Sequence, residues 1–264
     1  MLTRIRRSEA EWSVSSFSCE TLEKASRSLR ANGALILEDI VDAALIREAR
    51  ESFLERYVCY LDGHKHDDAL QVGERRLMIT LEVEPPFARR ELIANPLLIS
   101  VLKAAFEDDF VLGAYGIVCS LPGAPQQPIH QDGADLFRQT ALNRLLPLVA
   151  VTVGIPLVEM NEVNGTTALW PRSHRDDTLA STEKADEPLV REGSCVLWDY
   201  RLSHGGTPNR STATRPLLYM TYCRSWFLDH KNYRQQAAVR ASKCILATVP
   251  EDLRRLLVRA QDCH

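Results

Sequence analysis

The sequence predicts one mainly β domain, a strand-built sandwich or barrel with helices packed on one side. Helical patterns dominate the first 110 residues and the far C-terminus, whereas short strands separated by turn signals fill about 110–225. No linker or internal repeat divides the 264 residues, and barrels or sandwiches of this length are commonly single domains. We therefore expect one domain over 1–264, with a helical part at about 1–110 and a closing helix at about 250–261.

Composition is that of an ordinary soluble protein. The chain is 45% hydrophobic and 25% charged, and its net charge of −3 gives no reason to expect nucleic acid as a partner. The longest uncharged run, Leu145 to Val158, is too short to span a bilayer, and the charged N-terminus contains no secretory signal. The seven cysteines are scattered without a Cys-x-x-Cys pair, so we expect thiols in a reducing cytoplasm.

The first elements are defined by their ends. A helix is expected over 20–31, because Asn32-Gly33 is a typical C-terminal cap, and a short apolar strand follows at 34–39. Asp42 is a candidate N-cap for a long helix over 43–61, which carries apolar residues at helical spacing.

The polar segment 62–75 is interpreted as a loop, and a loop of that length is often a lid or a binding loop. Its histidines, His64 and His66, could close over a substrate, although solvated loop histidines are the commoner case. A strand is expected over 77–83, and Pro96 suits the first turn of a helix that runs to about residue 106.

The second half has the pattern of a β protein. A strand is expected over 110–120, followed by the turn 121–125. Bulky residues alternate with small ones over 149–157, which predicts a strand with one face suited to line a ligand cavity. Further strands are expected at 168–171, 194–199 and 215–222, with a turn at Asn164-Gly165 and a closing helix that begins at Pro250.

A histidine and a carboxylate lie two residues apart at His130 and Asp132. In an extended backbone both side chains would point to one side, with Gln131 turned away. An imidazole and a carboxylate are two of the three ligands in the facial triad that binds non-haem Fe(II). The pair alone also fits a surface turn in which Asp132 caps the next element.

Candidates for a third ligand are His174, His204, His230 and His264. His204 follows the strand at 194–199 and precedes Gly205-Gly206-Thr207-Pro208, which we interpret as a turn, so we expect it at a strand end. Arg215 begins the next strand, on the face of Leu217, Tyr219 and Thr221. A charge on an apolar face needs a partner, either an acidic residue or the carboxylate of a ligand.

Several short motifs occur together in one order, and their combination resembles the phytanoyl-CoA dioxygenase family of Fe(II)/2-oxoglutarate oxygenases. The resemblance covers about residues 75–225. The matching pieces are Pro122-Gly123, Gln127 with His130-Gln131-Asp132-Gly133, Asn164-Gly165, Trp170-Pro171-Arg172-Ser173-His174, Gly193, Trp198-Asp199, His204-Gly205, Pro208-Asn209, Ser211 and Arg215. Arg172 stands where the family usually has glycine.

The resemblance implies a double-stranded β-helix, or jelly-roll, core with flanking helices. It implies that His130, Asp132 and His204 bind Fe(II), that Arg215 binds the distal carboxylate of 2-oxoglutarate, and that Ser211 assists. Gln127 would contact 2-oxoglutarate or substrate, or else bond only to backbone. The implied reaction consumes O2, hydroxylates a C–H bond of a small molecule, and releases succinate and CO2. Because Asp132 is present, we expect hydroxylation or a related oxidation, not halogenation.

Two other functions use the same residues. One is a non-catalytic cupin-like metal-binding or sensor module, and the other is a zinc-dependent hydrolase with His130, Asp132 and His204 as ligands. Substrate specificity is expected in 62–75 and in 133–147, where Arg138 and Arg144 could meet an anionic substrate. Asp135 is expected at the surface or behind the metal ligands, and Trp170 and Trp198 in the core or cavity wall. The sequence makes no prediction of oligomeric state.

Overall fold

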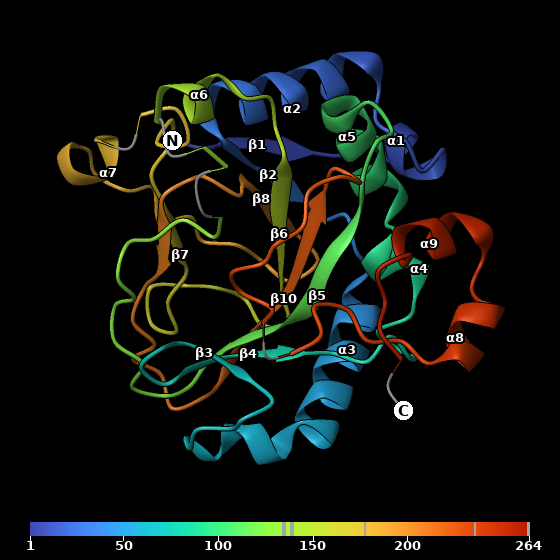
Figure 1. Ribbon diagram of the computed structural model, residues 1–264, viewed down its shortest axis with the longest axis vertical. Coiled ribbons are helices and arrows are strands. Elements are labelled where there is room, and N and C mark those ends of the chain that lie inside the picture. The colour runs from blue at the N-terminus through green and yellow to red at the C-terminus, as the bar shows by residue number, and fades with distance from the viewer. Residues whose placement is uncertain (134–135, 138–139, 177, 235, 263–264) are drawn as a thin grey trace.

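The strands of the protein form two sheets that lie against one another (Figure 1). The computed structural model describes residues 1–133, 136–137, 140–176, 178–234 and 236–262. In these ranges the larger sheet has eight strands in the order β1-β2-β8-β6-β10-β5-β4-β3, and the smaller sheet pairs β7 with β9. Only β1 and β2 pair in parallel among them. The strands are β1 (Thr3–Arg6), β2 (Ala34–Glu38), β3 (Leu70–Gly73), β4 (Arg76–Thr80), β5 (Val111–Ser120), β6 (Ala150–Pro156), β7 (Thr167–Leu169), β8 (Cys195–Asp199), β9 (His204–Gly206) and β10 (Arg215–Cys223).

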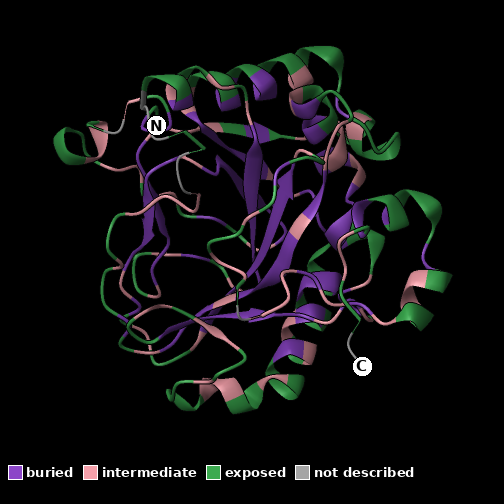
Figure 2. Cartoon of the chain, in the orientation of Figure 1, coloured by how far each residue is buried: buried purple, intermediate pink, exposed green. Residues whose placement is uncertain are grey.

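Helices cover one face of the larger sheet. Leu29, Phe53 and Leu98, from three different helices, belong to one buried cluster with side chains from the strands. Figure 2 shows buried central strands and helices whose outer faces are exposed. The helices are α1 (Glu9–Ser13), α2 (Cys19–Asn32), α3 (Ala43–Arg56), α4 (Arg90–Ile93), α5 (Pro96–Phe106), α6 (Thr140–Leu145), α7 (Leu179–Thr182), α8 (Lys243–Thr248) and α9 (Glu251–Leu256), with a 3-10 turn at Val58–Asp62. None of these helices in the described ranges is both long and apolar enough to cross a membrane.

Strand alternation separates the core from the site, as the sequence predicts. On β6, Val151 and Val153 join the cluster under the helices, whereas Thr152 points to the other side, where it bonds Asp132. On β10, Leu218 and Met220 face the helices, and the alternate residues line a cavity. This opposite face of the sheet carries the candidate site.

The expected caps of the first helices are confirmed. α2 begins after Ser18, whose side chain accepts from the Thr21 N–H, and ends at Gly33, whose φ of 76° lies in the left-handed region. The side chain of Asp42 accepts from the Ala44 N–H at the start of α3. The helix expected over 43–61 is too long, however, because α3 ends at Arg56. The next turn, Val58–Asp62, is a 3-10 helix in which no residue is fully buried, and it ends at Gly63, whose φ is 83°.

Two edge strands are not predicted by the sequence pattern. β3 lies within the segment 62–75 that was interpreted as a loop, and β1 precedes the first expected helix. Both occupy the ends of the larger sheet, where one side has no strand partner and few residues are buried. Each has only four residues, so its sequence is too short to establish the alternation that marks a half-buried strand. The closing helix is also shorter than expected, since α9 ends at Leu256 and a separate helix, α8, precedes it.

The turn expected at Gly205-Gly206 is wrong, because both glycines lie in β9. A Cβ on Gly205 would lie 3.1 Å from the Gln127 carbonyl oxygen, and one on Gly206 would lie 3.0 Å from Nε of Arg76. Glycine suits these positions because β9 approaches other segments closely, not because the chain turns.

Candidate metal centre

Three side chains from two distant segments converge at the sheet face away from the helices. Potential ligand atoms of His130, Asp132 and His204 all lie within 4.8 Å of one another. Asp132 Oδ1 is 3.4 Å from His204 Nε2, and the two imidazole centroids are 4.4 Å apart. The segment around His130 is not the regular strand that was expected. It forms one antiparallel bridge with His204, through two backbone hydrogen bonds of 2.9 Å, and then bends at Asp132.

Both histidines have one ring nitrogen committed to the backbone. His130 Nδ1 lies 2.9 Å from the Pro128 carbonyl oxygen, and His204 Nδ1 lies 2.9 Å from that of Leu202. A carbonyl only accepts, so Nδ1 of each ring carries the proton and Nε2 keeps its lone pair. This is the arrangement in which a protein orients imidazole for a metal.

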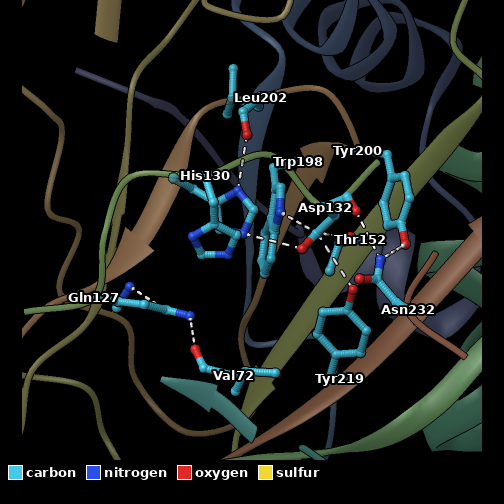
Figure 3. Close-up of polar contacts among 12 residues, drawn as sticks. Val72, Gln127, His130, Asp132, Thr152, Trp198, Tyr200, Leu202, Tyr219 and Asn232 are labelled. Carbon is cyan, nitrogen blue, oxygen red and sulfur yellow. Dashed lines mark hydrogen bonds and ion pairs between the residues drawn. The ribbon is translucent and has the colours of Figure 1, made fainter. Parts of the chain in front are cut away.

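One oxygen of Asp132 is held by three donors, which come from three adjacent strands (Figure 3). Asp132 Oδ2 accepts from Thr152 Oγ1 at 2.9 Å, from Trp198 Nε1 at 3.3 Å and from Tyr219 OH at 3.4 Å. Oδ1 faces His204 instead. The carboxylate is therefore fixed so that one oxygen remains for a cation.

The pKa values respond to burial and to the neighbouring charges. Burial raises the pKa of Asp132, but His204, His130 and Thr152 outweigh it, and the pKa lies below its ordinary value. Burial lowers the pKa of His130, and His204 lowers it further. Burial also opposes the charged form of His204, but Asp132 reverses the effect and raises that pKa. A carboxylate together with two imidazoles is the donor set that a divalent transition metal accepts.

A hydrogen-bonded cluster supports the Asp132 segment from behind. Asn232 Nδ2 donates to the Asp132 carbonyl oxygen at 2.8 Å and to Asp229 Oδ2 at 2.8 Å. The Tyr200 hydroxyl donates to the same Asp229 oxygen, and its carbonyl accepts from Gly133 N at 3.2 Å. A Cβ on Gly133 would lie 2.7 Å from the Tyr200 ring, so only glycine permits this contact.

A cavity of about 430 Å³ opens in front of the three residues. Its lining combines apolar walls with a few polar groups, as in typical small-molecule sites. The charged or metal-binding side chains that line it within the described ranges are Arg76, His130, Asp132, His204, Arg215 and Lys231.

Arg76 and Arg215 lie at the same level on opposite sides of Ser120. Both pair with Ser120 in the sheet register, one from β4 and one from β10. Arg76 Nη1 donates to the Pro125 carbonyl, Arg76 Nη2 donates to the Thr207 carbonyl at 2.6 Å, and Arg215 Nη1 donates to the Thr166 carbonyl at 3.1 Å. Nε of each arginine and Oγ of Ser120 are buried, with no partner among the described residues.

These arginines are buried charges that lack a carboxylate partner among the described residues. Arg76 is 1% exposed and Arg215 is 2% exposed. Burial lowers the pKa of Arg76 to about 10 and that of Arg215 to about 9. An uncompensated buried cation is unfavourable unless a ligand supplies the opposite charge. The two arginines are therefore suited to bind an anion. The sequence motifs did not identify Arg76 or Ser120 as site residues. The available signal was that Arg76 begins its strand, as Arg215 does.

Gln127 lines the cavity, and its amide bonds to backbone. Gln127 Nε2 donates to the Val72 carbonyl, and its Oε1 accepts from the Gly206 N–H at 2.9 Å. The side chain thus connects the 70–73 strand with β9. The Ser211 hydroxyl donates to Asn209 Oδ1 at 2.7 Å within the turn before β10.

The other histidines that the structure describes do not join the group. His174 is buried, but its Nε2 lies 3.3 Å from the Arg30 carbonyl oxygen. His66 Nε2 lies 3.1 Å from Asp62 Oδ1, in the exposed turn after α3. Trp170 is buried and donates to the Glu183 carbonyl oxygen at 3.1 Å. Asp135, Arg138 and His264 lie outside the described residues.

Arg172 has a φ of 72°, a conformation that favours glycine, which explains why glycine suits this position in related sequences. The backbone at Arg172 still donates to the Asn32 carbonyl oxygen at 2.8 Å. Arginine in place of the usual glycine therefore leaves the local turn and the metal centre intact.

Comparison with known proteins agrees with this geometry. A profile of the family described as Phytanoyl-CoA dioxygenase (PhyH) matches residues 29–217. Dioxygenase trt7 of Aspergillus terreus is 23% identical over 218 residues, which cover 80% of this chain and 76% of that protein. Dioxygenase cdmA of Talaromyces verruculosus is 25% identical over 205 residues, which cover 73% of this chain and 69% of that protein.

Solved structures share the fold. The non-heme alpha ketoglutarate dependent epimerase SnoN from nogalamycin biosynthesis has a TM-score of 0.61 at 15% identity, covering 79% of this chain and 84% of its own. HygX from Streptomyces hygroscopicus was solved with nickel and 2-oxoglutarate bound. It has a TM-score of 0.61 at 16% identity, and the match covers 81% of this chain and 90% of the HygX chain. The expectation of a jelly-roll core with flanking helices is confirmed.

Proposed function

The chain belongs to the phytanoyl-CoA dioxygenase family and is an oxygenase that depends on Fe(II) and 2-oxoglutarate, and we propose that His130, Asp132 and His204 bind its iron. The observation that carries the assignment is the convergence of two imidazoles and one carboxylate within 4.8 Å. Two histidines and one carboxylate form the facial triad of non-haem iron oxygenases, which leaves positions open for cosubstrates. The backbone carbonyls behind both rings and the three donors on Asp132 support this role, since they hold each ligand atom in place.

For 2-oxoglutarate, we propose that its distal carboxylate binds between Arg76 and Arg215, with Ser120 as a further donor. Two guanidinium groups suit a carboxylate because each can donate more than one charge-assisted hydrogen bond. The unpartnered Nε atoms and the Ser120 hydroxyl supply donors on the cavity side of the sheet. Gln127 would form the wall beside the cosubstrate, and Ser211 would act indirectly, by fixing the turn that leads into Arg215.

When bound, Fe(II) and 2-oxoglutarate supply the oxidising chemistry, in which O2 is consumed and succinate and CO2 are released. The chain binds both, orients the metal ligands and provides an apolar cavity for a small-molecule substrate. We propose hydroxylation of a C–H bond, because the carboxylate ligand Asp132 is present. Neither a zinc hydrolase nor a non-catalytic sensor accounts for two buried arginines beside the metal centre.

We further propose that the whole chain acts as one oxygenase domain in the cytoplasm. The described N-terminal helices share one core cluster with the strands, which supports a single folding unit. Cys119, Cys195 and Cys223 are buried free thiols, which suits a reducing compartment.

The metal assignment is tested by anaerobic Fe(II) titration of wild-type protein and Asp132→Ala, followed by addition of 2-oxoglutarate. We expect the wild type to develop the visible absorption of an Fe(II)–2-oxoglutarate complex and the variant to lose both iron binding and this absorption. Asp108→Ala, which changes an exposed carboxylate, should behave as the wild type. Iron affinity unchanged by Asp132→Ala would contradict the assignment.

A further inference from the structure

We propose that the primary substrate carries an anionic group on an apolar body, and that Lys231 binds this group at the mouth of the cavity. The inference deepens the proposed function and rests on it, because it assigns the part of the cavity that iron and 2-oxoglutarate leave open. Lys231 both lines the cavity and is exposed, so it lies at the rim.

The charges that line the cavity do not balance without a further anion. Three cationic side chains, Arg76, Arg215 and Lys231, line it within the described ranges, and Asp132 is the one carboxylate there. With Fe(II) bound, these three side chains and the metal carry five positive charges, whereas Asp132 and 2-oxoglutarate together carry three negative charges. The Lys231 ammonium group has no carboxylate within ion-pair distance among the described residues. An anion from the substrate would supply the missing partner.

The backbone at Lys231 is fixed relative to the metal ligands. Asp229 Oδ1 accepts from the N–H groups of Lys231 at 2.8 Å and Asn232 at 3.0 Å, which holds this turn. The next side chain, Asn232, donates to the Asp132 carbonyl oxygen at 2.8 Å. The backbone of the lysine is thus held one residue from a direct contact with the metal-binding segment.

Lys231 is next to Asn232, which contacts the Asp132 segment, whereas Arg76 and Arg215 lie at the level of Ser120 in the sheet. Arg215 is at the first position of β10, and the Asp132 carboxylate is contacted by Tyr219 farther along the same strand. Lys231 follows the end of that strand. The proposed site for the substrate anion is therefore adjacent to the metal-binding segment, and the proposed site for the cosubstrate anion is at the level of Ser120.

The remaining lining restricts the class of substrate. Apolar side chains from four segments face the same space, namely Leu70, Val72, Met78, Leu217, Tyr219 and Tyr233. They suit an aliphatic or aromatic body, whereas the surplus of positive charge disfavours amines. Because a lysine ammonium is a compact point charge, it accepts a carboxylate or a phosphate.

The test uses four probes with the same ring system: 2-naphthoate, 2-naphthyl phosphate, 2-naphthalenemethanol and 2-naphthylmethylamine. Each is titrated calorimetrically into the anaerobic Fe(II)–2-oxoglutarate protein, as wild type, Lys231→Met, Lys231→Arg and the control Lys24→Met. We expect at least one anion to bind the wild type about tenfold or more tightly than the alcohol, and the amine to bind least. Lys231→Met should remove this preference, while Lys231→Arg and Lys24→Met keep it.

The two anions show whether the site takes a carboxylate or a phosphate. No preference for either anion in the wild type, including no detectable binding, would overturn the proposal, as would a preference that survives in Lys231→Met. Affinity for 2-oxoglutarate is measured first in every variant and should not change. Its absence in the wild type would instead overturn the proposed function itself, so the two failures are distinguishable.

Discussion

Replacing Arg215 with methionine should stabilise the cosubstrate-free protein while it removes 2-oxoglutarate binding. The guanidinium is 2% exposed, its Nε has no partner among the described residues, and burial lowers its pKa to about 9. At about 1.4 kcal/mol for each tenfold change in a protonation equilibrium, a fall from 12.5 to about 9 corresponds to roughly 5 kcal/mol of unfavourable burial. Methionine fills similar space without a charge.

Part of this gain is offset by a lost hydrogen bond. Arg215 Nη1 donates to the Thr166 carbonyl at 3.1 Å, and a bond to a charged group contributes about 1.5–3 kcal/mol. We therefore expect Arg215→Met to raise the free energy of unfolding by about 2–3.5 kcal/mol, within the range seen when poorly compensated buried charges are replaced. The same change removes charge-assisted hydrogen bonds to the cosubstrate, so 2-oxoglutarate affinity should fall by at least about 100-fold.

Urea denaturation of the metal-free protein measures the first effect, and calorimetric titration of the metal-loaded protein measures the second. Arg201→Met is a matched control, because Arg201 forms a two-point ion pair with Asp199, with donor–acceptor distances of 2.9 and 2.7 Å. Removing a paired buried charge leaves Asp199 uncompensated and should cost about 3–5 kcal/mol. A similar loss of stability in both variants would refute the reasoning about Arg215, and unchanged affinity would refute its role with 2-oxoglutarate.

Three further changes probe the surroundings of the site and the N-terminus. Gly133→Ala would place a Cβ 2.7 Å from the Tyr200 ring, so it should displace Asp132 and weaken Fe(II) affinity about tenfold or more in an anaerobic titration; wild-type affinity would contradict this. Asn232→Ala removes the donor to the Asp132 carbonyl, and it should lower stability by about 1–3 kcal/mol in urea and weaken iron binding, whereas a loss of stability alone would limit Asn232 to a structural role. The pKa of Glu11 is lowered to about 2, because hydrogen bonds from Ser18, Ser8 and Thr21 together outweigh the opposing effect of burial. Its stabilisation is present above the ordinary pKa of 4.5 and lost as pH falls towards 2, so Glu11→Gln should flatten the acid end of a stability–pH profile, and an unchanged profile would count against it.

The sequence predicts those parts of the fold that local chemistry determines. The helix ends at Gly33 and Asp42, the alternation on β6 and β10, and the spacing of His130 and Asp132 all depend on residues close together in the sequence. The edge strands β1 and β3 could not be predicted, because their pairing depends on neighbours that only the folded sheet supplies.

The same limit applies to the site. Arg215 belongs to a recognisable set of motifs, but Arg76 enters the cavity only through the register of β4 with β5 and β10. Its carbonyl partners, at Pro125 and Thr207, are equally remote in the sequence. Trp198 was expected in the core or cavity wall, and its bond to Asp132 becomes visible only once β8 lies beside β6.

The reciprocal backbone bonds between His130 and His204 have a consequence for how the enzyme acquires its metal. These residues are brought together by tertiary structure alone, so a nascent or partly folded chain has no high-affinity place for iron. Loading must follow folding, and the metal then stabilises the finished molecule in proportion to the logarithm of its free concentration. Scarcity of iron in a cell would consequently lower the resistance of this protein to unfolding as well as its turnover.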